Sequence, residues 1–244
     1  MILIKEIAEN LLLEKLKDDI ELQRIDGEEA KHFILSHYLG NAPSGGTIYY
    51  GVFHKPSQKL LGVISYSSPT KPTDYQEISL NPVTGESYIN SNEIVELTRL
   101  YFPDEIDLPN IESFTISAGN KLIKRDKPQI KVIITRADAG RHVGSIYQAT
   151  NAIYLGKSRD SMRPFHRETN VEIRSDEYEK YGFNSIRELR RMLDLNPNIP
   201  VELKTRSGKH KYIYIVTTNK RTKEEILTNL ITKPQPYPKK EMSV

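Results

Sequence analysis

The segment Ile130–Gly156 reads IKVIITRADAGRHVGSIYQATNAIYLG. Its first part, up to Asp138, is rich in β-branched residues and lacks polar alternation, which is typical of a strand buried on both faces. The glycine-bearing loop AGRHVG follows, and SIYQATNA and IYLG then predict a short helix and another strand. Asp138 therefore ends a buried strand, where open α/β sheets commonly place ligand-contacting groups.

Upstream of this segment, hydrophobic periodicity and turn residues predict alternating helices and strands. Asp26-Gly27 breaks a strand and can cap the next helix, and Asn110 or Ser113 can cap a later one. The predicted elements are a helix at Ile4–Lys17, a strand at Ile20–Ile25, a helix at Glu28–His37, a hairpin of Thr47–Phe53 with Lys59–Tyr66, a strand at Glu93–Phe102 and a helix from Asn110 or Ser113 to about Arg125. The polar stretches Gly40–Gly46 and Ser67–Asn92 predict loops.

Downstream, two further helices are predicted at Ser185–Leu195 and Thr222–Leu230. A hairpin is expected to pair Val201–Lys204 with Lys211–Val216 across Ser207-Gly208. The resulting order, β-α-β-β-loop-β-α-β-α-β, predicts the α/β (α+β) class, with a mixed central sheet flanked by helices. We expect residues 1–160 to form this core and residues 161–244 a small basic extension packed on it. The order resembles the core of the GCN5-related N-acetyltransferase superfamily.

The composition is that of a globular protein, with 37% hydrophobic and 27% charged residues. No apolar run approaches the ~20 residues that cross a bilayer, and the N-terminus places acids directly after its apolar residues, unlike a secretory signal. Cysteine is absent, which excludes disulfides and thiolate metal sites. We therefore expect a cytoplasmic protein.

The net charge of +3 is compatible with a nucleic-acid partner without requiring one. Lys and Arg are dense from Lys204 to Lys240, where tyrosines are interleaved. Lys209 and Lys211 lie in this stretch, and basic groups near aromatic rings suit a surface that follows a nucleic-acid backbone. The alternative interpretation is a solvated edge strand and tail.

Missing motifs narrow the chemistry. The chain has no GxGxxG or GxxxxGK[ST] phosphate-binding loop, no HExxH and no GxSxG. An ordinary acetyltransferase binds the CoA pyrophosphate with a glycine loop after its fourth strand, and the corresponding stretch here, LYFPDEIDLPNIES, contains no glycine. Use of CoA is therefore doubtful even if the fold is acetyltransferase-like.

The strongest candidate site is the window that begins at Asp138. Asp138 and His142 could act as base and orienting group, or both could bind a metal. Tyr147 and Asn151 are expected to share a helix face, with Gln148 beside them. The alternative is that Asp138 merely caps the helix that follows.

Two other candidates lie in predicted core elements. His37 and Tyr38 end a helix, where His suits either proton transfer or the helix dipole. Arg99 is expected to share a strand face with Val95, Leu97 and Tyr101, so that a buried guanidinium needs a ligand or an acid such as Asp138.

These residues lie in stretches that resemble the Mom family of phage DNA modification proteins. The resemblance runs from about Ile34 to Lys239, and its most specific part is Ala137–Gly156, with Ala-Asp, His-x-Gly and Ile-Tyr-Gln-Ala-x-Asn. Other matching stretches are HFILSHYLG, YYGVF with LLGVISY, VELTRLYF, NIESFTIS and KHKYIYI with ITKPQPYPK.

The resemblance implies an acetyltransferase-like fold that installs a carbamoylmethyl group on N6 of adenine in duplex phage DNA, protecting it from host restriction enzymes. It further implies a bound iron, a group donor other than ordinary acetyl-CoA, and action in the host cytoplasm; a homodimer is compatible with it. The functional candidates that it places on this chain are His37, Tyr38, Arg99, Ser113, Asp138 and Tyr147.

A base modified inside a duplex must be extruded into a pocket. Tyr38, Tyr49 or Tyr147 could stack on it, and Gln148 or Asn151 could pair with its polar edge. Asp138 would orient or deprotonate the amine, or bind a metal together with His37.

One departure concerns Arg136, because the family commonly has Ser-Tyr-Ala-Asp where this chain has Thr135-Arg136-Ala137-Asp138. An arginine here could stabilise the Asp138 anion and weaken it as a base, or hold a phosphate. Two other functions are weighed against the family's: an acyl-CoA-dependent N-acyltransferase acting on a small molecule or protein, and a non-catalytic DNA-binding anti-restriction protein.

Overall fold

The structure, a computed structural model, describes residues 18–37, 48–69, 78 and 89–239. The described residues fall into two units. The first contains the chain up to Arg136 together with Gly144–Gly156 and Lys211–Pro238, and the second contains Ala137–Val143, Lys157–His210 and Lys239. Each unit is described by itself.

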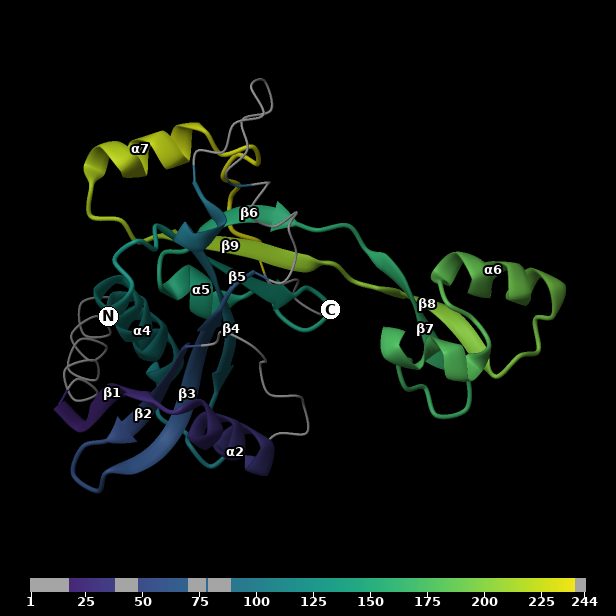
Figure 1. Cartoon of the computed structure of the whole chain (residues 1–244), viewed down its shortest axis with the longest axis horizontal. Helices are drawn as coiled ribbons and strands as arrows, with labels where there is room; N and C mark the ends of the chain where they lie inside the picture. Colours follow the sequence, from purple (N-terminus) through teal and green to yellow (C-terminus); the bar gives the residue numbers. More distant parts are fainter. Residues whose placement is uncertain (1–17, 38–47, 70–77, 79–88, 240–244) are drawn as a thin grey trace, which may run out of the picture. The chain divides into compact units, whose positions relative to one another are not determined.

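A seven-stranded sheet forms the centre of the first unit (Figure 1). Four strands form an antiparallel meander, and the fifth pairs with β4 in parallel, with Ile94 opposite Val132. In spatial order the strands are β1 (Ile20–Ile25), β2 (Ile48–His54), β3 (Lys59–Ser67), β4 (Ile94–Tyr101), β5 (Val132–Asp138), β9 (Lys209–Ile215) and β6 (Ile153–Lys157). The β-branched run of β5 thus lies inside the sheet, as its sequence predicts.

Helix α4 (Ile111–Asp126) makes the crossover that a parallel β4–β5 pair requires. It packs on the sheet through apolar contacts and two buried tyrosines. The phenol of Tyr66 donates to Asn120 Oδ1 at 2.9 Å, and that of Tyr50 donates to Asp126 Oδ2 at 2.9 Å. The tyrosines on this side of the sheet therefore satisfy their hydroxyl groups on the helix.

Two further helices of the first unit cover apolar residues of the sheet. Helix α2 (Gly27–His37) buries Ala30 and Ile34 against Tyr49 and Val63. Helix α7 (Lys220–Thr228) places Ile226 in a second cluster, whose other members include Ile94, Val132, Ile134, Leu155 and Ile213. These clusters and the α4 contacts give the mixed sheet flanked by helices that the sequence predicts.

The second unit contains its own small core. Strands β7 (Ser161–His166) and β8 (Val201–Arg206) pair in antiparallel fashion, with Phe165 opposite Glu202. A 3-10 helix, η2 (Ser175–Tyr181), and helix α6 (Ile186–Leu195) complete the unit. Their buried side chains are Ile173, Tyr178, Phe183, Leu189 and Val201.

Most predicted elements of the described chain are confirmed to within two residues, including β1, the β2–β3 hairpin and α7, while α5 (Ser145–Ala149) begins where predicted and ends three residues early. The predicted cap after Asp26 is also present, because Asp26 Oδ1 accepts a hydrogen bond from the N–H of Glu28 at 2.7 Å. β7, η2 and the 3-10 helix η1 (Ser91–Glu93) were not predicted. The predicted helix at Ile4–Lys17, the loop at Gly40–Gly46 and most of Ser67–Asn92 lie outside the described residues.

The predicted hairpin between Val201–Lys204 and Lys211–Val216 is wrong. β8 pairs with β7, whereas β9 lies between β5 and β6 in the large sheet. Ser207-Gly208 is therefore the point at which the chain leaves one sheet for another. The predicted boundary at residue 160 also differs from the structure, because Lys211–Pro238 belongs to the first unit. The physical reason is that β9 completes the large sheet and α7 covers part of it.

Among the helices that the structure describes, none combines the length and apolar character needed to cross a bilayer.

Candidate functional site

Asp138 lies in the second unit, where its carboxylate is held by one cation and one backbone group. Its Oδ2 lies 3.5 Å from an Arg206 guanidinium nitrogen, and its Oδ1 accepts a hydrogen bond from Gly140 N–H at 3.1 Å. Arg206 Nη1 also donates to both carboxylate oxygens of Glu172, at 2.8 and 3.1 Å. One guanidinium thus bridges two carboxylates. The pairing orients the Asp138 carboxylate at the end of β5.

The Asp138 carboxylate does not cap the helix that follows. The N-cap residue of α5 is Gly144, which has no side-chain cap and adopts a left-handed conformation with φ of 71°. The Asp138 carbonyl oxygen instead accepts from Arg141 and His142 N–H groups, at 2.9 and 3.0 Å. These bonds form the turn after β5, and the Asp138 side chain contacts Arg206 and Gly140 N–H instead.

The backbone around Gly208 packs closely against the turn that follows β5 and against Ser158. Ala139 N–H donates to the carbonyl of Gly208 at 3.1 Å, and Gly208 N–H donates to Asp160 Oδ1 at 2.9 Å. A Cβ on Gly208 would lie 1.9 Å from the carbonyl oxygen of Ser158, closer than any side chain can approach. Glycine is therefore required at position 208.

The two histidines nearest to this turn differ in exposure. His142 is exposed, whereas His210 is buried and has a lowered pKa, because burial disfavours its cation and because Lys157 and His142 lie nearby. His210 is thus held neutral near pH 7. Sequence reasoning singled out His142 and missed His210, whose only signal was its position in a run of alternating β9 residues.

Arg136 does not act on Asp138 as we expected. Its guanidinium pairs with Glu96 on the neighbouring strand β4 in the first unit, and both side chains are largely buried. Arg136 and Glu96 therefore neutralise each other inside the sheet. The cation beside Asp138 is instead Arg206, which lies 68 positions after it in the chain and could not be identified from local sequence.

Arg99 lies on the opposite face of the sheet from Leu97, which contradicts the predicted alternation. Ser65 is opposite Arg99 and Tyr66 is opposite Leu97, so two neighbouring residues of β3 face residues that are two apart on β4. The extra residue is Thr98, whose hydroxyl lies 3.0 Å from that of Ser65. This β-bulge reverses the side-chain alternation.

Tyr147 is the buried residue of α5 in the first unit. Its ring centroid lies 5.4 Å from that of Tyr212 on β9, which in turn lies 5.0 Å from that of Tyr154 on β6. Burial raises the pKa of the Tyr147 phenol, and the nearby Glu112 carboxylate raises it further. The hydroxyl of Thr135 is close enough to oppose this shift but makes no regular hydrogen bond. Tyr147 is therefore a neutral hydrogen-bond donor at physiological pH.

Polar side chains surround these rings. Gln148 Nε2 donates to the phenol oxygen of Tyr212 at 3.2 Å, and the Thr150 hydroxyl lies 2.6 Å from that of Tyr214. Helix α5 ends at Ala149, however, and Asn151 is exposed with φ of 58°. The expectation that Asn151 shares a helix face with Tyr147 is therefore wrong, because the helix ends three residues before Ala152, the last residue of the predicted helix.

The C-terminal segment binds the same part of the first unit. Gln235 N–H donates to the Tyr154 carbonyl at 2.9 Å, and the Tyr237 phenol donates to the Ala152 carbonyl at 2.7 Å. Gln148 Nε2 also lies 3.4 Å from the Pro238 carbonyl oxygen. These contacts hold Gln235–Pro238 against the α5–β6 region, and the phosphate contacts expected of the basic C-terminal stretch stay a prediction.

The other predicted site residues are more dispersed. The Ser113 hydroxyl donates to the Asn110 carbonyl at 3.0 Å within the first turn of α4, and Tyr49 is buried against α2. Lys209 is exposed and Lys211 half-buried at the start of β9. His37 is the last residue of α2, but its side chain and all of Tyr38 lie outside the described residues.

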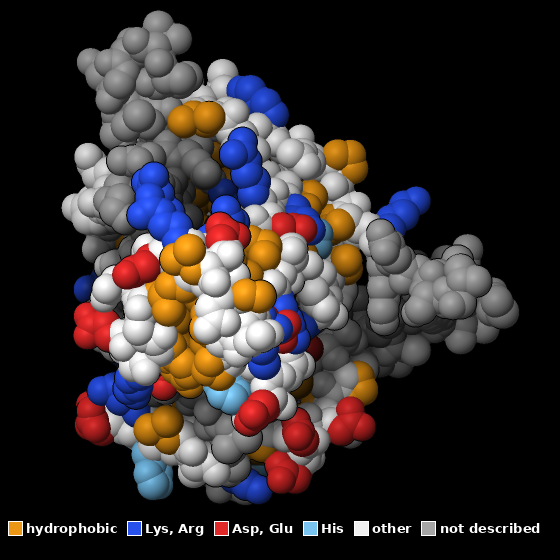
Figure 2. Space-filling model, turned by 90° about the vertical axis from the view of Figure 1, so that its right-hand side faces the viewer, with side chains coloured by type: hydrophobic (Ala, Val, Ile, Leu, Met, Phe, Trp, Pro, Cys, Tyr) orange, Lys and Arg blue, Asp and Glu red, His pale blue; other side chains and the backbone are white. Residues whose placement is uncertain are grey.

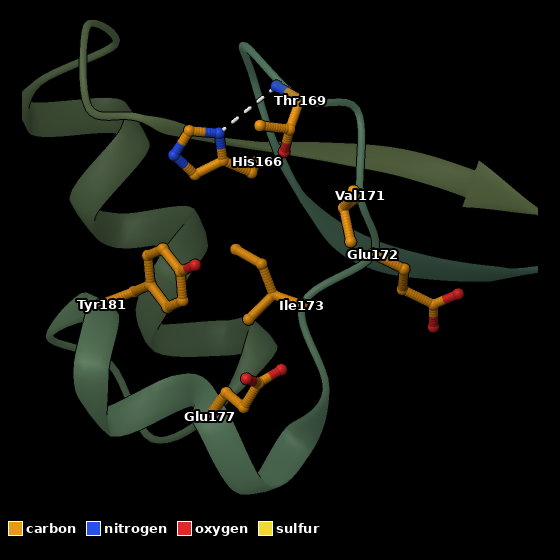
Figure 3. Close-up of a pocket in the computed structure, with 7 residues that line it drawn as sticks. All are labelled: His166, Thr169, Val171, Glu172, Ile173, Glu177 and Tyr181. Atoms are coloured by element: carbon orange, nitrogen blue, oxygen red, sulfur yellow. Dashed lines mark hydrogen bonds between the residues drawn. The ribbon is translucent and has the colours of Figure 1, made fainter. Parts of the chain in front are cut away.

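A pocket of about 330 Å³ lies in the second unit (Figure 3). His166 and Tyr181 meet edge to face with centroids 6.2 Å apart, and Ile173 lies beside them. Glu172 points away from these residues, toward its partner Arg206. The pocket was not predicted, because the two elements that contribute His166, Glu177 and Tyr181 to it, β7 and η2, were not predicted.

The described residues do not form a binding site that fits either iron or CoA. No three of their His, Asp or Glu side chains group as metal ligands, and Asp138 is paired with Arg206. Where CoA would place its pyrophosphate, at the N-terminus of α4, the exposed charged side chains are all acids, namely Asp104, Glu105, Asp107 and Glu112. Like charge makes this turn a poor fit for a pyrophosphate.

Comparison with known proteins gives one match to a family. A model of the Mom protein family matches residues 19–239. No curated protein matches the chain.

Several solved acetyltransferases share the chain's general architecture. The spermidine/spermine N-acetyltransferase of Vibrio cholerae is 8% identical with a TM-score of 0.45, covering 82% of this chain and 95% of its own. The ribosomal-protein-S5-alanine acetyltransferase of Vibrio fischeri is 10% identical at 0.43, with coverages of 82% and 94%. The acetyltransferase of Salmonella typhimurium that modifies the N-terminal serine of ribosomal protein L7/L12 is 10% identical at 0.42, with coverages of 81% and 95%. Similarities this distant carry no argument about activity.

Proposed function

Because the chain belongs to the Mom protein family, we propose that it is a DNA modification transferase that adds a carbamoylmethyl-type group to N6 of adenine in duplex phage DNA. The modified adenine would no longer suit host restriction enzymes. The family match spans most of the chain and includes the whole block from Ala137 to Gly156, and this match is the observation that carries the proposal.

The tyrosine cluster of the first unit supports a base as the substrate. An enzyme that modifies adenine in a duplex must extrude the base and recognise it by stacking and by its polar edge. Tyr147, Tyr154 and Tyr212 pack ring against ring, with the Gln148 amide at the edge of the cluster. Aromatic rings beside a side-chain amide are the groups that such recognition uses.

The transfer has a defined electron balance. Adenine N6 forms a bond to the methylene carbon of an activated carbamoylmethyl donor, the leaving group departs with the bonding electrons, and N6 loses one proton. Delocalisation into the ring makes the N6 lone pair a weak nucleophile, so donor activation supplies much of the rate. A carboxylate such as Asp138 can accept the proton, and a neutral phenol such as Tyr147 can donate a hydrogen bond to developing negative charge.

The acids around the start of α4 support a donor other than CoA. An acyl-CoA-dependent enzyme would need this turn to bind a pyrophosphate, and its exposed carboxylates oppose that. If this chain binds an iron, as the family resemblance implies, His37 and Asp138 are the residues that would hold it.

Mass spectrometry of nucleosides from cells that express the protein tests the proposal. We expect a modified adenosine with the wild-type chain and none with Asp138→Asn, which keeps the acceptor for Gly140 N–H but removes the negative charge. Salt-sensitive DNA binding should survive this substitution.

Each rival predicts a different result. A non-catalytic anti-restriction protein would leave unmodified DNA that restriction enzymes cut normally once protein is removed. An acyl-CoA-dependent enzyme would be protected by acetyl-CoA against thermal unfolding and would leave the adenosine unchanged.

A further inference from the structure

Helix α6 of the second unit has a buried apolar side and an exposed basic side. Leu189 is fully buried, and Ile186, Met192 and Leu193 pack against the same core. The opposite side carries Arg187, Arg190 and Arg191, all exposed. We call these three residues the arginine face; their i, i+3 and i, i+4 spacing places them next to one another.

The arginine face is not neutralised within the described part of the chain. None of its three guanidinium groups forms an ion pair with a described acid, whereas five other cations of this unit do: Lys157, Arg174, Lys180, Lys204 and Arg206. Glu188, the nearest acid, accepts from Asn184 N–H at 2.8 Å and is thereby used to cap the helix. Asp194 lies four residues after Arg190 and does not pair with it.

The arrangement costs helix stability. Like charges at i, i+3 and i, i+4 repel, and Arg187 lies in the first turn, where the helix dipole disfavours a cation. Ser185 and Glu188 cap the helix well, so the arginines add nothing to its start. A clustered, unneutralised charge that the fold does not use points to an external anion.

Helix α7 of the first unit shows the ordinary alternative. It also begins with exposed cations, Lys220, Arg221 and Lys223. Two of them form an ion pair with the acid four residues later. Lys220 lies 4.0 Å from Glu224, and Arg221 lies 2.9 Å from Glu225. The two helices thus carry equal positive charge at similar positions, and only α6 leaves all of it unneutralised.

The charge of α6 belongs to a locally basic part of the chain. Residues 157–210 contain twelve Lys and Arg against nine Asp and Glu, an excess equal to the net charge of the whole chain. In the view of Figure 2 basic and acidic side chains are intermixed, so no single-sign field extends over that whole face. The basic feature is therefore a local one.

We propose that the arginine face of α6 is a docking surface for the phosphate backbone of DNA. The choice of DNA as the polyanion rests on the proposed function. Guanidinium groups suit this partner because they bind phosphate oxygens in a two-pronged way and remain charged at any relevant pH. Contacts of this kind position the duplex and do not read its sequence.

The test measures the affinity of the full-length protein for a duplex oligonucleotide as a function of salt. The variant replaces Arg187, Arg190 and Arg191 with Gln, and the matched control replaces Lys220, Arg221 and Lys223 with Gln, which removes the same charge from α7. Each lost phosphate contact should reduce the slope of log K against log salt by about 0.9, and reduce affinity roughly tenfold at 0.1 M salt.

We expect the α6 variant to lose two to three such contacts (~10²–10³-fold) and the α7 control to lose few or none. An α6 variant with the wild-type slope, equal losses in both variants, or a wild-type protein that does not bind duplex DNA would each overturn the inference. The three single substitutions, each expected to lower the slope by about 0.9, replace the triple variant if it does not fold.

Nucleoside analysis of cells that express the wild-type chain separates this inference from the proposed function. If the wild-type chain leaves adenosine unmodified while the α6 variant still loses DNA affinity, the proposed chemistry fails and the docking surface stands. If adenosine is modified by the wild-type chain and the α6 variant binds DNA unchanged, only the docking surface fails.

Discussion

The guanidinium of Arg206 lies 3.5 Å from the carboxylate of Asp138 while making its closest ion pair, at 2.8 Å, with Glu172. Asp138 ends strand β5 and Arg206 ends strand β8, so the contact joins the last residues of two strands that belong to different sheets. The anion that the sequence marks as the best catalytic candidate is thus oriented by a residue that no sequence pattern associates with it.

Arg206→Gln removes the cation and leaves two carboxylates near one another. Because the groups are partly exposed, we expect the free energy of unfolding to fall by only about 1 kcal/mol. Urea denaturation measures the loss. Adding Glu172→Gln to this variant should recover part of the stability, since it removes one of the facing charges; a double variant no more stable than Arg206→Gln would contradict this account.

Tyr147→Phe removes one hydroxyl from the ring cluster without changing its packing. The phenol makes no regular hydrogen bond to Thr135, so stability should change little, whereas loss of a donor to the reacting groups should reduce modified adenosine by roughly 10²–10⁴-fold. Nucleoside mass spectrometry and a melting curve provide the two readouts.

Tyr50→Phe is the matched control for this prediction. It removes a phenol that donates to Asp126 at 2.9 Å, so about 1 kcal/mol of stability should be lost with no change in modification. Equal activity of wild type and Tyr147→Phe would remove Tyr147 from the chemistry.

Gly208→Ala should destabilise the second unit by about 1–3 kcal/mol, because the new Cβ would overlap the Ser158 carbonyl. Gly140→Ala is its control: the nearest atom to a Cβ there is Asp138 Oδ1 at 3.4 Å, an ordinary contact. Proteolysis with time, followed by mapping of the cut sites, reports on this unit separately. Similar resistance of both variants would show that the chain at Gly208 can move aside.

Acidification should weaken the second unit through His210. The folded-state pKa of His210 is lowered, so below about pH 6.5 the unfolded chain takes up a proton that the folded chain resists. The contribution is fully present above that pH and is lost as pH falls toward the folded-state value. The fall in stability between pH 7.5 and 5.5 should be smaller in His210→Gln than in wild type, as measured by urea midpoints at each pH. An unchanged pH dependence would mean that His210 titrates normally.

Local sequence determined most of the described secondary structure and the main candidate window of this protein. The β-branched run Val132–Ile134 is apolar on both faces of the strand. Its sequence therefore predicted the buried position inside the sheet that the structure shows. Asp26 predicted the start of α2 correctly, because its carboxylate accepts a hydrogen bond from the backbone N–H of Glu28, only two residues away. Such signals act within a few residues, and sequence patterns report them well.

Tertiary structure decided which strands and which charges meet. Lys204 and Lys211 lie seven positions apart and look like two arms of a hairpin, yet β8 and β9 bind different partners, because alternation records that a strand has a buried face and not what lies against it. The bulge at Thr98 turns Arg99 to the other face, and Arg136 is neutralised by Glu96 from the adjacent strand. Sequence alone specified the residue types available for chemistry; the pairing of strands, a long-range property, decided that Arg206 and not Arg136 accompanies Asp138.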